Sequence, residues 1–388
     1  MSKASDQPNR LIKKAVIRGT RFLKKHAPLN AESEKELPEF NHRSRPVVAV
    51  DAMGGDYAPL EIVKGSLRAA RELDIAVQLV GPTERIQTEL RKYDDWRNLP
   101  VEIISAEEYL EMDEKQPAVA VRRKPGLSIN VAMRQVSEGK ADAFVGAGST
   151  GGVAASALFT LKRIKGIERP GIGAVVPTSK GQMILVDAGA NVDSTPYQMA
   201  QHAIMGSIFA SIYFGIESPQ IGLLNIGEEP SKGNHSAKNT FSVLEKLKTI
   251  NFVGNVEGRT IAEHYCDVLV ADGFVGNVFL KTAEGSVKMA FQIMHQELTK
   301  SLDLKMGALI CRPAFRAIKH ERLNYAKYGG AILLGVHGVV VVAHGISNDF
   351  AIMNAIKLAA ESTRSRIVRR IEDALKTDEL DALVAESE

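Results

Sequence analysis

The stretch AFVGAGSTGG at residues 143–152 joins an apolar run to a loop of glycine, serine and threonine. Four more segments repeat this pattern of an apolar run followed by a loop of small or polar residues: VAVDAMGGD (48–56), LVDAGAN (185–191), LLNIGEEPSKGN (223–234) and LVADGFVGN (269–277). In an open α/β sheet such loops lie at the carboxyl ends of strands, where small residues let backbone N–H groups approach an anion. We therefore expect the five loops to converge on one anion-binding crevice.

Short β-rich runs alternate with helical stretches from Val47 onward, which is typical of a mostly parallel sheet with helices on both faces. The expected strands are Val47 to Asp51, Ala76 to Val80, Val101 to Ile104, Ala143 to Val145, Ile172 to Val176, Met183 to Asp187, Gln220 to Ile226, Val268 to Ala271 and Val339 to Ala343. The expected helices include Pro59 to Leu73, Ile129 to Glu138, Thr150 to Leu161, Tyr197 to Phe214, Ser236 to Leu247 and Ile346 to Leu375. The predicted fold class is therefore α/β with three αβα layers.

Residues 276–325 interrupt this rhythm, because they contain no convincing strand. An apolar stripe at Val287, Ala290, Phe291, Met294 and Leu298 predicts a long helix, and the segment as a whole predicts a protruding helix pair. Its tip, residues 302–315, is apolar but is set among lysines and arginines. Such a tip is suited equally to burial in a dimer and to contact with an anionic membrane surface.

Composition places the chain among globular proteins: it has 388 residues, 45% of them hydrophobic and 24% charged. A net charge of +3 gives no chain-wide basic field, so we expect no nucleic-acid partner. Two cysteines, Cys266 and Cys311, indicate a reducing, cytoplasmic setting. The sequence contains no run of about 18 apolar residues, so we expect no membrane-spanning helix, and it contains no recognisable secretory signal.

Residues 1–46 form a basic N-terminal arm that we expect to be separate from the catalytic domain at 47–388. The arm is basic up to residue 26 and then reverses sign at residues 32–36. Its composition fits a solvated tail, a membrane-surface helix or an organelle-targeting peptide.

Gly146, Gly148 and Gly151 form a G-x-G-x-x-G motif between a strand and a helix. A dinucleotide site also needs an acidic residue at the end of the next strand, but that strand ends in VVPT (175–178). We interpret the loop as an anion site without a nucleotide.

Two side chains in these loops are suited to acyl-transfer chemistry. Lys232 is a cation in a glycine-rich loop, where it either faces an anion or remains a solvated surface lysine. Asn277 is either a helix N-cap or an amide that donates to a carbonyl oxygen. Asp51, Asp56, Asp187 and Asn191 are likewise either ligands or residues that stabilise their turns.

The sequence contains no G-x-S-x-G elbow and no H-E-x-x-H motif, and its nine histidines and two cysteines have no metal-ligand spacing. This favours chemistry in which the substrates supply the reactive groups and the protein supplies orientation and charge stabilisation.

Eight ordered blocks together resemble the bacterial phosphate acyltransferase family of phospholipid synthesis. They are AVDAMGGD (49–56), AVRRK (120–124), GAGSTG (146–151), RIKGIERP (163–170), DAGANVD (187–193), GLLNIG (222–227), DGFVGN (272–277) and YGGA (328–331). The resemblance runs from Val47 to the last helix and leaves the arm outside it.

The resemblance implies that phosphate attacks the thioester of an acyl chain on acyl carrier protein. The product, acyl phosphate, then feeds a downstream glycerol-3-phosphate acyltransferase. It further implies a Rossmann-like fold of the isocitrate and isopropylmalate dehydrogenase type, no cofactor and no metal. By the same resemblance the protein is a homodimer at the cytoplasmic membrane surface, and the segment 276–325 makes the dimer and membrane contacts.

Roles carried over from the matching motifs make Lys232 and Asn277 catalytic. The implied substrate-binding residues are Asp51, Gly54, Gly55, Asp56, Ser149, Thr150, Gly151, Asp187, Asn191, Asn225, Gly227, Asp272, Gly273 and Gly276. The implied membrane residues are Leu304, Met306, Leu309, Ile310 and Phe315. One departure from the family pattern is Pro230, which stands among usually polar residues close to Lys232.

Three other functions compete with this interpretation. A nicotinamide-dependent dehydrogenase would bind NAD, and a short-chain acyltransferase would turn over acetyl coenzyme A. A membrane or nucleic-acid scaffold would depend on the basic arm.

Overall fold

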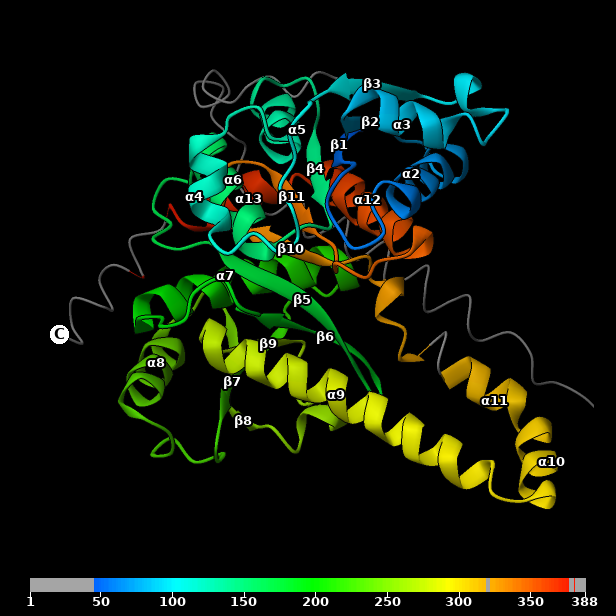
Figure 1. Ribbon diagram of the computed structural model, residues 1–388. Coiled ribbons are helices and arrows are strands. Elements are labelled where there is room, and N and C mark those ends of the chain that lie inside the picture. Colours follow the sequence, from blue (N-terminus) through cyan, green and yellow to red (C-terminus); the bar gives the residue numbers. More distant parts are fainter. Residues whose placement is uncertain (1–44, 319–321, 377–379, 381–388) are drawn as a thin grey trace, which may run out of the picture.

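The computed structural model describes residues 45–318, 322–376 and 380, so residues 1–44 of the expected arm lie outside the described part. One sheet of eleven strands runs through the molecule in the order β3-β2-β1-β4-β11-β10-β5-β6-β9-β7-β8 (Figure 1). The strands are β1 (Val47–Asp51), β2 (Ala76–Gly81), β3 (Val101–Ser105), β4 (Ala143–Gly146), β5 (Gly171–Thr178), β6 (Gly181–Val186), β7 (Gln220–Asn225), β8 (Asn251–Glu257), β9 (Val268–Val270), β10 (Ala331–Leu334) and β11 (Val339–Val342).

Helices cover both faces of this sheet, which confirms the three-layer αβα fold. One face carries α2 (Leu60–Glu72), α3 (Thr83–Leu90), α7 (Pro196–Phe214), α8 (His235–Lys246), α12 (Asp349–Arg364) and α13 (Ile367–Ala374). The other face carries α4 (Pro117–Arg123), α5 (Ser128–Ser137), α6 (Thr150–Thr160) and the first part of α9 (Gly273–Leu298).

The two cores follow from the alternation of side chains along each strand. In β1, Val48 and Val50 are buried in the core under α2 and α12, whereas Ala49 is buried under α5. Successive strand residues point to opposite faces, so a strand buried on both faces is apolar at every position. The short apolar runs of the sequence therefore become central strands.

The sheet reverses direction in its middle, so the five loops do not all leave it at the same edge, contrary to what the sequence led us to expect. β10 is antiparallel to both β11 and β5, and β5 is antiparallel to β6. The strands β6, β9 and β7 therefore run opposite to β1, β4 and β11. The loops after β1 and β4 leave one edge of the sheet, and the loops after β6, β7 and β9 leave the opposite edge.

Within the segment 276–325, the later part of α9 and the helices that follow it up to residue 317 form a hairpin that extends away from the body (Figure 1). Its outgoing arm is α9, a helix of 26 residues that begins at Gly273. The return arm is not one long helix but two short ones, α10 (Leu302–Ile310) and α11 (Arg312–Ala317), because the chain turns at Cys311 and Pro313 starts the next turn.

Several other elements differ from expectation. The strands β8 and β10 and the helices α3 and α4 were not predicted. The stretch 346–375 is two helices rather than one, since Arg366 adopts a left-handed conformation (φ 54°) between α12 and α13.

Candidate active site

A cavity of about 1040 Å³ lies on the α6 side of the central strands, and we call it the central cavity. Its floor is made by residues of β5, β10 and β11, and its walls come from the start of α6, from α9 and from residues 343–351. Among the residues that line it are Thr150, Ala188, Asn277, Leu280, Lys281, Glu284, Val287, Phe291, Gln292, Leu323, Tyr328, Gly330, His344 and Ser347.

The N-terminus of α6 opens into this cavity at Thr150. Its N-cap, Ser149, makes no side-chain hydrogen bond to the first turn. By contrast, Asp272 caps α9 through Val275 N, and Asn348 caps α12 through Ala351 N. Uncapped N–H groups at a helix N-terminus bind anions, so the GAGSTG loop is the part of the cavity best suited to phosphate.

Asn277 lies in the second turn of α9 and lines the central cavity. The N-cap of α9 is Asp272, which removes the alternative that Asn277 is a cap. Its side chain lies against Gly189, where a Cβ would stand 3.2 Å from Asn277 Cγ. Gly189 has φ 132°, so its backbone conformation favours glycine, and a side chain there would crowd the Asn277 amide.

The Asp187 carboxylate is fully buried and organises the loop that follows β6. Its Oδ1 accepts hydrogen bonds from the N–H groups of Ile172 (2.9 Å), Gly189 (3.0 Å) and Ala190 (2.9 Å). Its Oδ2 accepts from the backbone N (2.8 Å) and the Nδ2 (2.9 Å) of Asn191. In this structure both oxygens are occupied, so Asp187 shapes the loop beside Asn277 and leaves no free acceptor.

The loop after β1 is closely packed against neighbouring loops of its own edge. Asp51 is buried, and burial raises the pKa of its carboxyl to about 6. The hydrogen bond that Asp51 Oδ1 accepts from Met53 N (3.2 Å) lowers the pKa, but by less than burial raises it. A Cβ at Gly54 would overlap the backbone of Gly148, and Asp56 N donates to Gly345 O (2.8 Å).

The loop that carries Lys232 is held by side chains from β7 and β8. Asn225 Nδ2 donates to Lys232 O (3.2 Å) and to Asn255 Oδ1 (3.0 Å), and Asn255 Nδ2 donates to Glu229 O (2.9 Å). The Lys232 ammonium is half exposed and lies 4.0 Å from the Glu229 carboxylate. These hydrogen bonds therefore fix the backbone on both sides of Pro230.

Of the residues predicted for catalysis and substrate binding, only Thr150 and Asn277 line the central cavity. Lys232 does not, so the shared hollow expected for Lys232 and Asn277 is not formed, although β7 and β9 are neighbours and their loops leave the same edge. Gly273 and Gly276 are covered by the backbone of residues 187–191, and Gly151 faces Pro117 of α4. Gly227 lies against the Lys232 side chain.

Several cavity residues had no predicted role. His344 and Ser347 follow β11, and the YGGA block at Tyr328–Ala331 lines the cavity beside them, since Gly330 lies against the backbone of Val342 and Ala331 pairs with the same residue. The block was recognised as a motif, and its glycines with positive φ, Gly329 (77°) and Gly330 (153°), were the available signal of a close backbone approach.

Within residues 45–318, 322–376 and 380, no group of three His, Cys, Asp or Glu side chains is arranged to hold a metal ion.

Comparison with known proteins places the chain in a sequence family. The profile of the family described as "Fatty acid synthesis protein" matches residues 47–370. A "Phosphate acyltransferase" of Gloeothece citriformis (strain PCC 7424) is 48% identical over 331 residues, covering 85% of this chain and 93% of the relative. A protein of the same name from Desulfitobacterium hafniense (strain Y51) is 49% identical over 331 residues, covering 84% and 97%.

Solved structures share the fold at low sequence identity. A phosphotransacetylase from Streptococcus pyogenes matches with a TM-score of 0.55 at 18% identity, covering 87% of this chain and 99% of that one. The EutD phosphotransacetylase from Staphylococcus aureus matches with a TM-score of 0.51 at 14% identity, covering 82% and 94%.

Proposed function

Because this chain belongs to the fatty acid synthesis protein family, we propose that it transfers a long-chain acyl group from acyl carrier protein to inorganic phosphate. That the chain is an acyltransferase follows from its relatives, which are named phosphate acyltransferases. The acyl carrier protein, the length of the acyl chain and the use of the product are our proposals.

The observation that carries the proposal is the composition of the central cavity. One wall presents the uncapped N-terminus of α6, which suits an oxyanion. The cavity continues along α9 past Leu280, Val287 and Phe291, with Leu323 also in its lining. Lys281 and Glu284, which also line it, are paired with each other at 2.9 Å. These features support a site that takes a phosphate and an apolar chain in one cavity.

In the proposed reaction, an oxygen of phosphate attacks the thioester carbonyl carbon and forms a tetrahedral oxyanion. Collapse of this intermediate breaks the C–S bond, so acyl phosphate forms and the thiolate leaves and takes up a proton. We propose that Asn277, which lines the cavity, donates from Nδ2 to the developing oxyanion, a contribution that typically amounts to a factor of about 10²–10³ in rate.

Lys232 is our second proposed catalytic residue, with its ammonium stabilising the phosphate or the oxyanion. The position of its loop beside the start of α9, on the neighbouring strand, supports this role. Its ammonium has to leave Glu229 to take part.

The remaining loops are proposed to shape the substrate site. On one edge these are Asp51, Gly54, Gly55, Asp56, Ser149, Thr150 and Gly151. On the other they are Asp187, Asn191, Asn225, Gly227, Asp272, Gly273 and Gly276. Their hydrogen bonds and close contacts support a positioning role for most of them, with Thr150 nearest to substrate.

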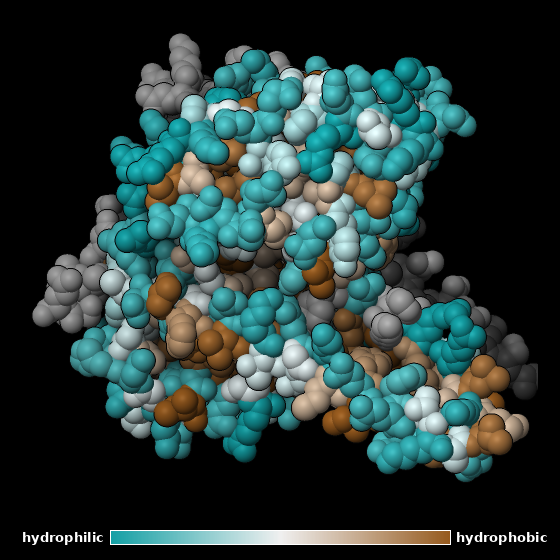
Figure 2. All heavy atoms as spheres, viewed as in Figure 1, coloured by the Kyte–Doolittle hydropathy of each residue, from teal (hydrophilic) through white to brown (hydrophobic). Residues whose placement is uncertain are grey.

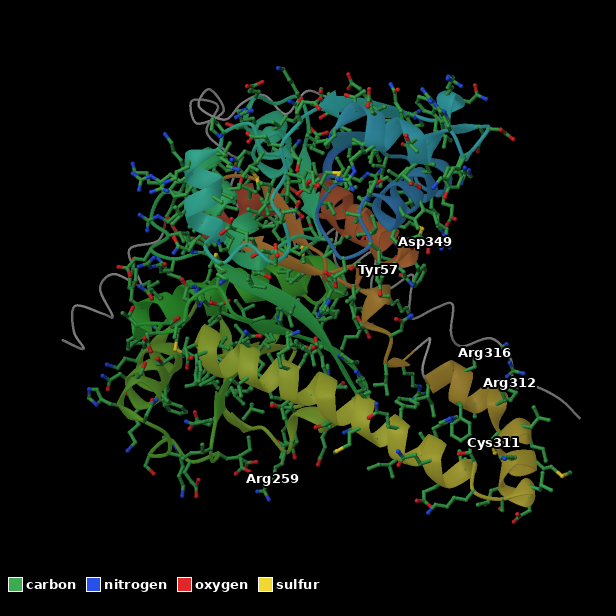
Figure 3. The ribbon with its side chains drawn as sticks, viewed as in Figure 1. Tyr57, Arg259, Cys311, Arg312, Arg316 and Asp349 are labelled. Carbon is green, nitrogen blue, oxygen red and sulfur yellow. The ribbon has the colours of Figure 1, made fainter. Side chains whose placement is uncertain are left out.

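The hairpin is proposed to make the dimer and membrane contacts. α9 exposes Val278, Met289 and Ile293, which suit a second copy of the chain. At the tip, Leu304, Met306, Leu309 and Ile310 are exposed, whereas Phe315 is partly buried. Figure 2 shows brown, apolar side chains at this far end, and Figure 3 places Arg312 and Arg316 next to them.

This arrangement of apolar and cationic side chains suits an anionic membrane surface. Acyl phosphate would then be released where a glycerol-3-phosphate acyltransferase works. No helix among the described residues is long and apolar enough to cross a membrane.

The test is an assay for thiol release from palmitoyl carrier protein with and without phosphate. We expect release that depends on phosphate, no turnover of acetyl coenzyme A and no saturable binding of NAD. Release without phosphate would indicate a thioesterase, and turnover of acetyl coenzyme A would indicate the short-chain alternative.

A further inference from the structure

A second cavity, of about 620 Å³, lies beside the RIKGIERP block at residues 163–170. The proposed reaction assigns no role to this block, although Asn191 Nδ2 donates to Pro170 O (2.7 Å). The cavity, which we call the arginine cavity, is lined by Ala154, Leu158, Arg163, Glu168, Arg169, Pro170, Ala190, Asn191, Gln198 and Leu333.

The loop that supplies the two arginines is held in place by buried groups. Gln201, which is 1% exposed, accepts from Glu168 N (2.9 Å) and donates to Gly166 O (2.7 Å). Ile164 and Ile167 are buried beneath the loop, and Ile164 N donates to Gly335 O (3.0 Å). The arginines therefore project from a fixed backbone.

The charges of this cavity are unbalanced. Among the described residues, no carboxylate lies within ion-pair distance of Arg163 or Arg169. Arg163 donates to the backbone carbonyl of Glu168, while the Glu168 carboxylate accepts from Gln198 Nε2 (3.0 Å). Two guanidinium groups against one carboxylate leave an excess positive charge. Planar guanidinium groups are well matched to phosphate oxygens.

The arginine cavity adjoins the central cavity through two shared elements. Thr150 of α6 lines the central cavity, and Ala154 and Leu158 of the same helix line the arginine cavity. Ala188 lines the first and Ala190 the second, both on the loop that Asp187 organises. Along α6, the step from Leu158 to Thr150 is about 12 Å, at about 1.5 Å per residue.

We propose that the arginine cavity binds the phosphate group of the phosphopantetheine arm on which the donor carries its acyl thioester. The proposal rests on the proposed function. An arm held by its phosphate at Arg163 and Arg169 would pass along α6 and the Asp187 loop and present its sulfur end in the central cavity. Inorganic phosphate, the attacking substrate, must instead lie at the thioester carbon, which places it in the central cavity.

Calorimetric titration tests this assignment without relying on turnover. We expect 4′-phosphopantetheine to bind the full-length protein about tenfold or more tightly than pantetheine, which lacks the phosphate. Arg169→Gln should remove this preference. Arg169 has no side-chain hydrogen bond to lose among the described residues, so its substitution should leave the thermal unfolding midpoint unchanged. Arg163→Gln is the second variant. Lys165→Gln is the matched control, since it removes an exposed charge from the same loop outside the cavity.

Equal binding of the two compounds by the wild-type protein, or an undiminished preference in both arginine variants, would overturn the assignment. Steady-state assays distinguish binding of the phosphopantetheine phosphate in this cavity from binding of inorganic phosphate there. We expect the variants to raise the KM for palmitoyl-phosphopantetheine and to leave the KM for inorganic phosphate unchanged. A rise confined to the KM for inorganic phosphate would assign the cavity to that substrate and contradict the proposal. Absence of any acyl phosphate from the wild-type protein would count against the proposed function, while the binding result would still decide the cavity.

Discussion

Gly276 of α9 lies directly against the carbonyl oxygen of Asp187, so closely that a Cβ at this position would overlap it. This contact joins the helix that carries Asn277 to the loop that Asp187 organises. It explains why the DGFVGN block needs glycine one residue before the proposed carbonyl donor.

Gly276→Ala should therefore displace the start of α9 and lower both the thermal unfolding midpoint and the activity. Overpacking of this kind typically costs about 1–3 kcal/mol. Gly285→Ala is the matched control, because it lies in the same helix with open space around its Cα and should be neutral or stabilising by up to about 1 kcal/mol. Equal unfolding midpoints for the two variants would contradict the contact.

Asn277→Ala should lower kcat/KM by about 10²–10³ and leave the fold intact, because the amide is proposed to stabilise the oxyanion. Gln292→Ala removes a second carboxamide that lines the same cavity on the same helix, and it should have a much smaller effect. Comparable losses in both variants would mean that the cavity, and not the Asn277 amide, is sensitive to substitution.

Lys232→Ala should reduce the rate at saturating substrate, because the ammonium is proposed to stabilise negative charge, while Lys232→Arg should retain part of the activity. Lys180→Ala, an exposed lysine in the turn between β5 and β6, is the control for removing a surface charge. Near-normal turnover by Lys232→Ala would leave Lys232 as the half-exposed surface lysine that it is in this structure.

The pH dependence of stability should report the burial of Asp51. Its folded pKa is raised to about 6 from 3.8, so the folded chain binds more protons than the unfolded chain between these values. The stabilisation is fully present below about pH 4 and is lost as the pH rises to about 6, by on the order of 3 kcal/mol. Asp51→Asn should remove this part of the pH dependence in urea unfolding between pH 4 and 7. An identical pH profile in both proteins would show that Asp51 is not buried as described.

The native cysteines allow a fluorescent probe to be attached at the hairpin tip without introducing a new cysteine. Cys311 is exposed at the hairpin tip (Figure 3), whereas burial raises the pKa of the Cys266 thiol to about 12, so a maleimide fluorophore should label Cys311 alone. Anionic vesicles should shift its emission to the blue, and Leu309→Glu with Ile310→Glu should abolish the shift. Val253→Glu, at another exposed apolar site, should not. A shift that persists in the Leu309→Glu, Ile310→Glu protein would exclude the tip as the contact.

Local patterns in the sequence predicted most strands and helices, but they did not predict how the strands pair in the sheet. The five loops were located correctly at the ends of strands, since the change from apolar to small residues is a local signal. The reversal of the sheet was missed because it comes from the antiparallel pairing of β5 with β6, and the alternation of short apolar runs does not specify the direction of a strand. As a consequence, loops expected at one edge occupy two.

In the site, too, the sequence located individual residues, but their roles depend on contacts between distant segments. Asn277 was found because a polar residue follows glycines at a helix start, although its alternative role as a cap could be rejected only with Asp272 in view. The Asp187 side chain looked equally suited to binding a ligand, and only its five hydrogen bonds reveal how it is used. Arg163 and Arg169 belonged to a recognised block, but their shared cavity depends on residues from α6 and the loop after β6.

The central claim is that an oxygen of inorganic phosphate becomes bonded to the acyl carbon in the cavity that Thr150 and Asn277 line. The most direct test is to incubate the protein with palmitoyl carrier protein and ³²P-labelled orthophosphate and to follow the label into the acyl product. We predict labelled palmitoyl phosphate, formed in proportion to released carrier thiol and strongly reduced by Asn277→Ala. Thiol release that yields free palmitate with no label attached would contradict the account.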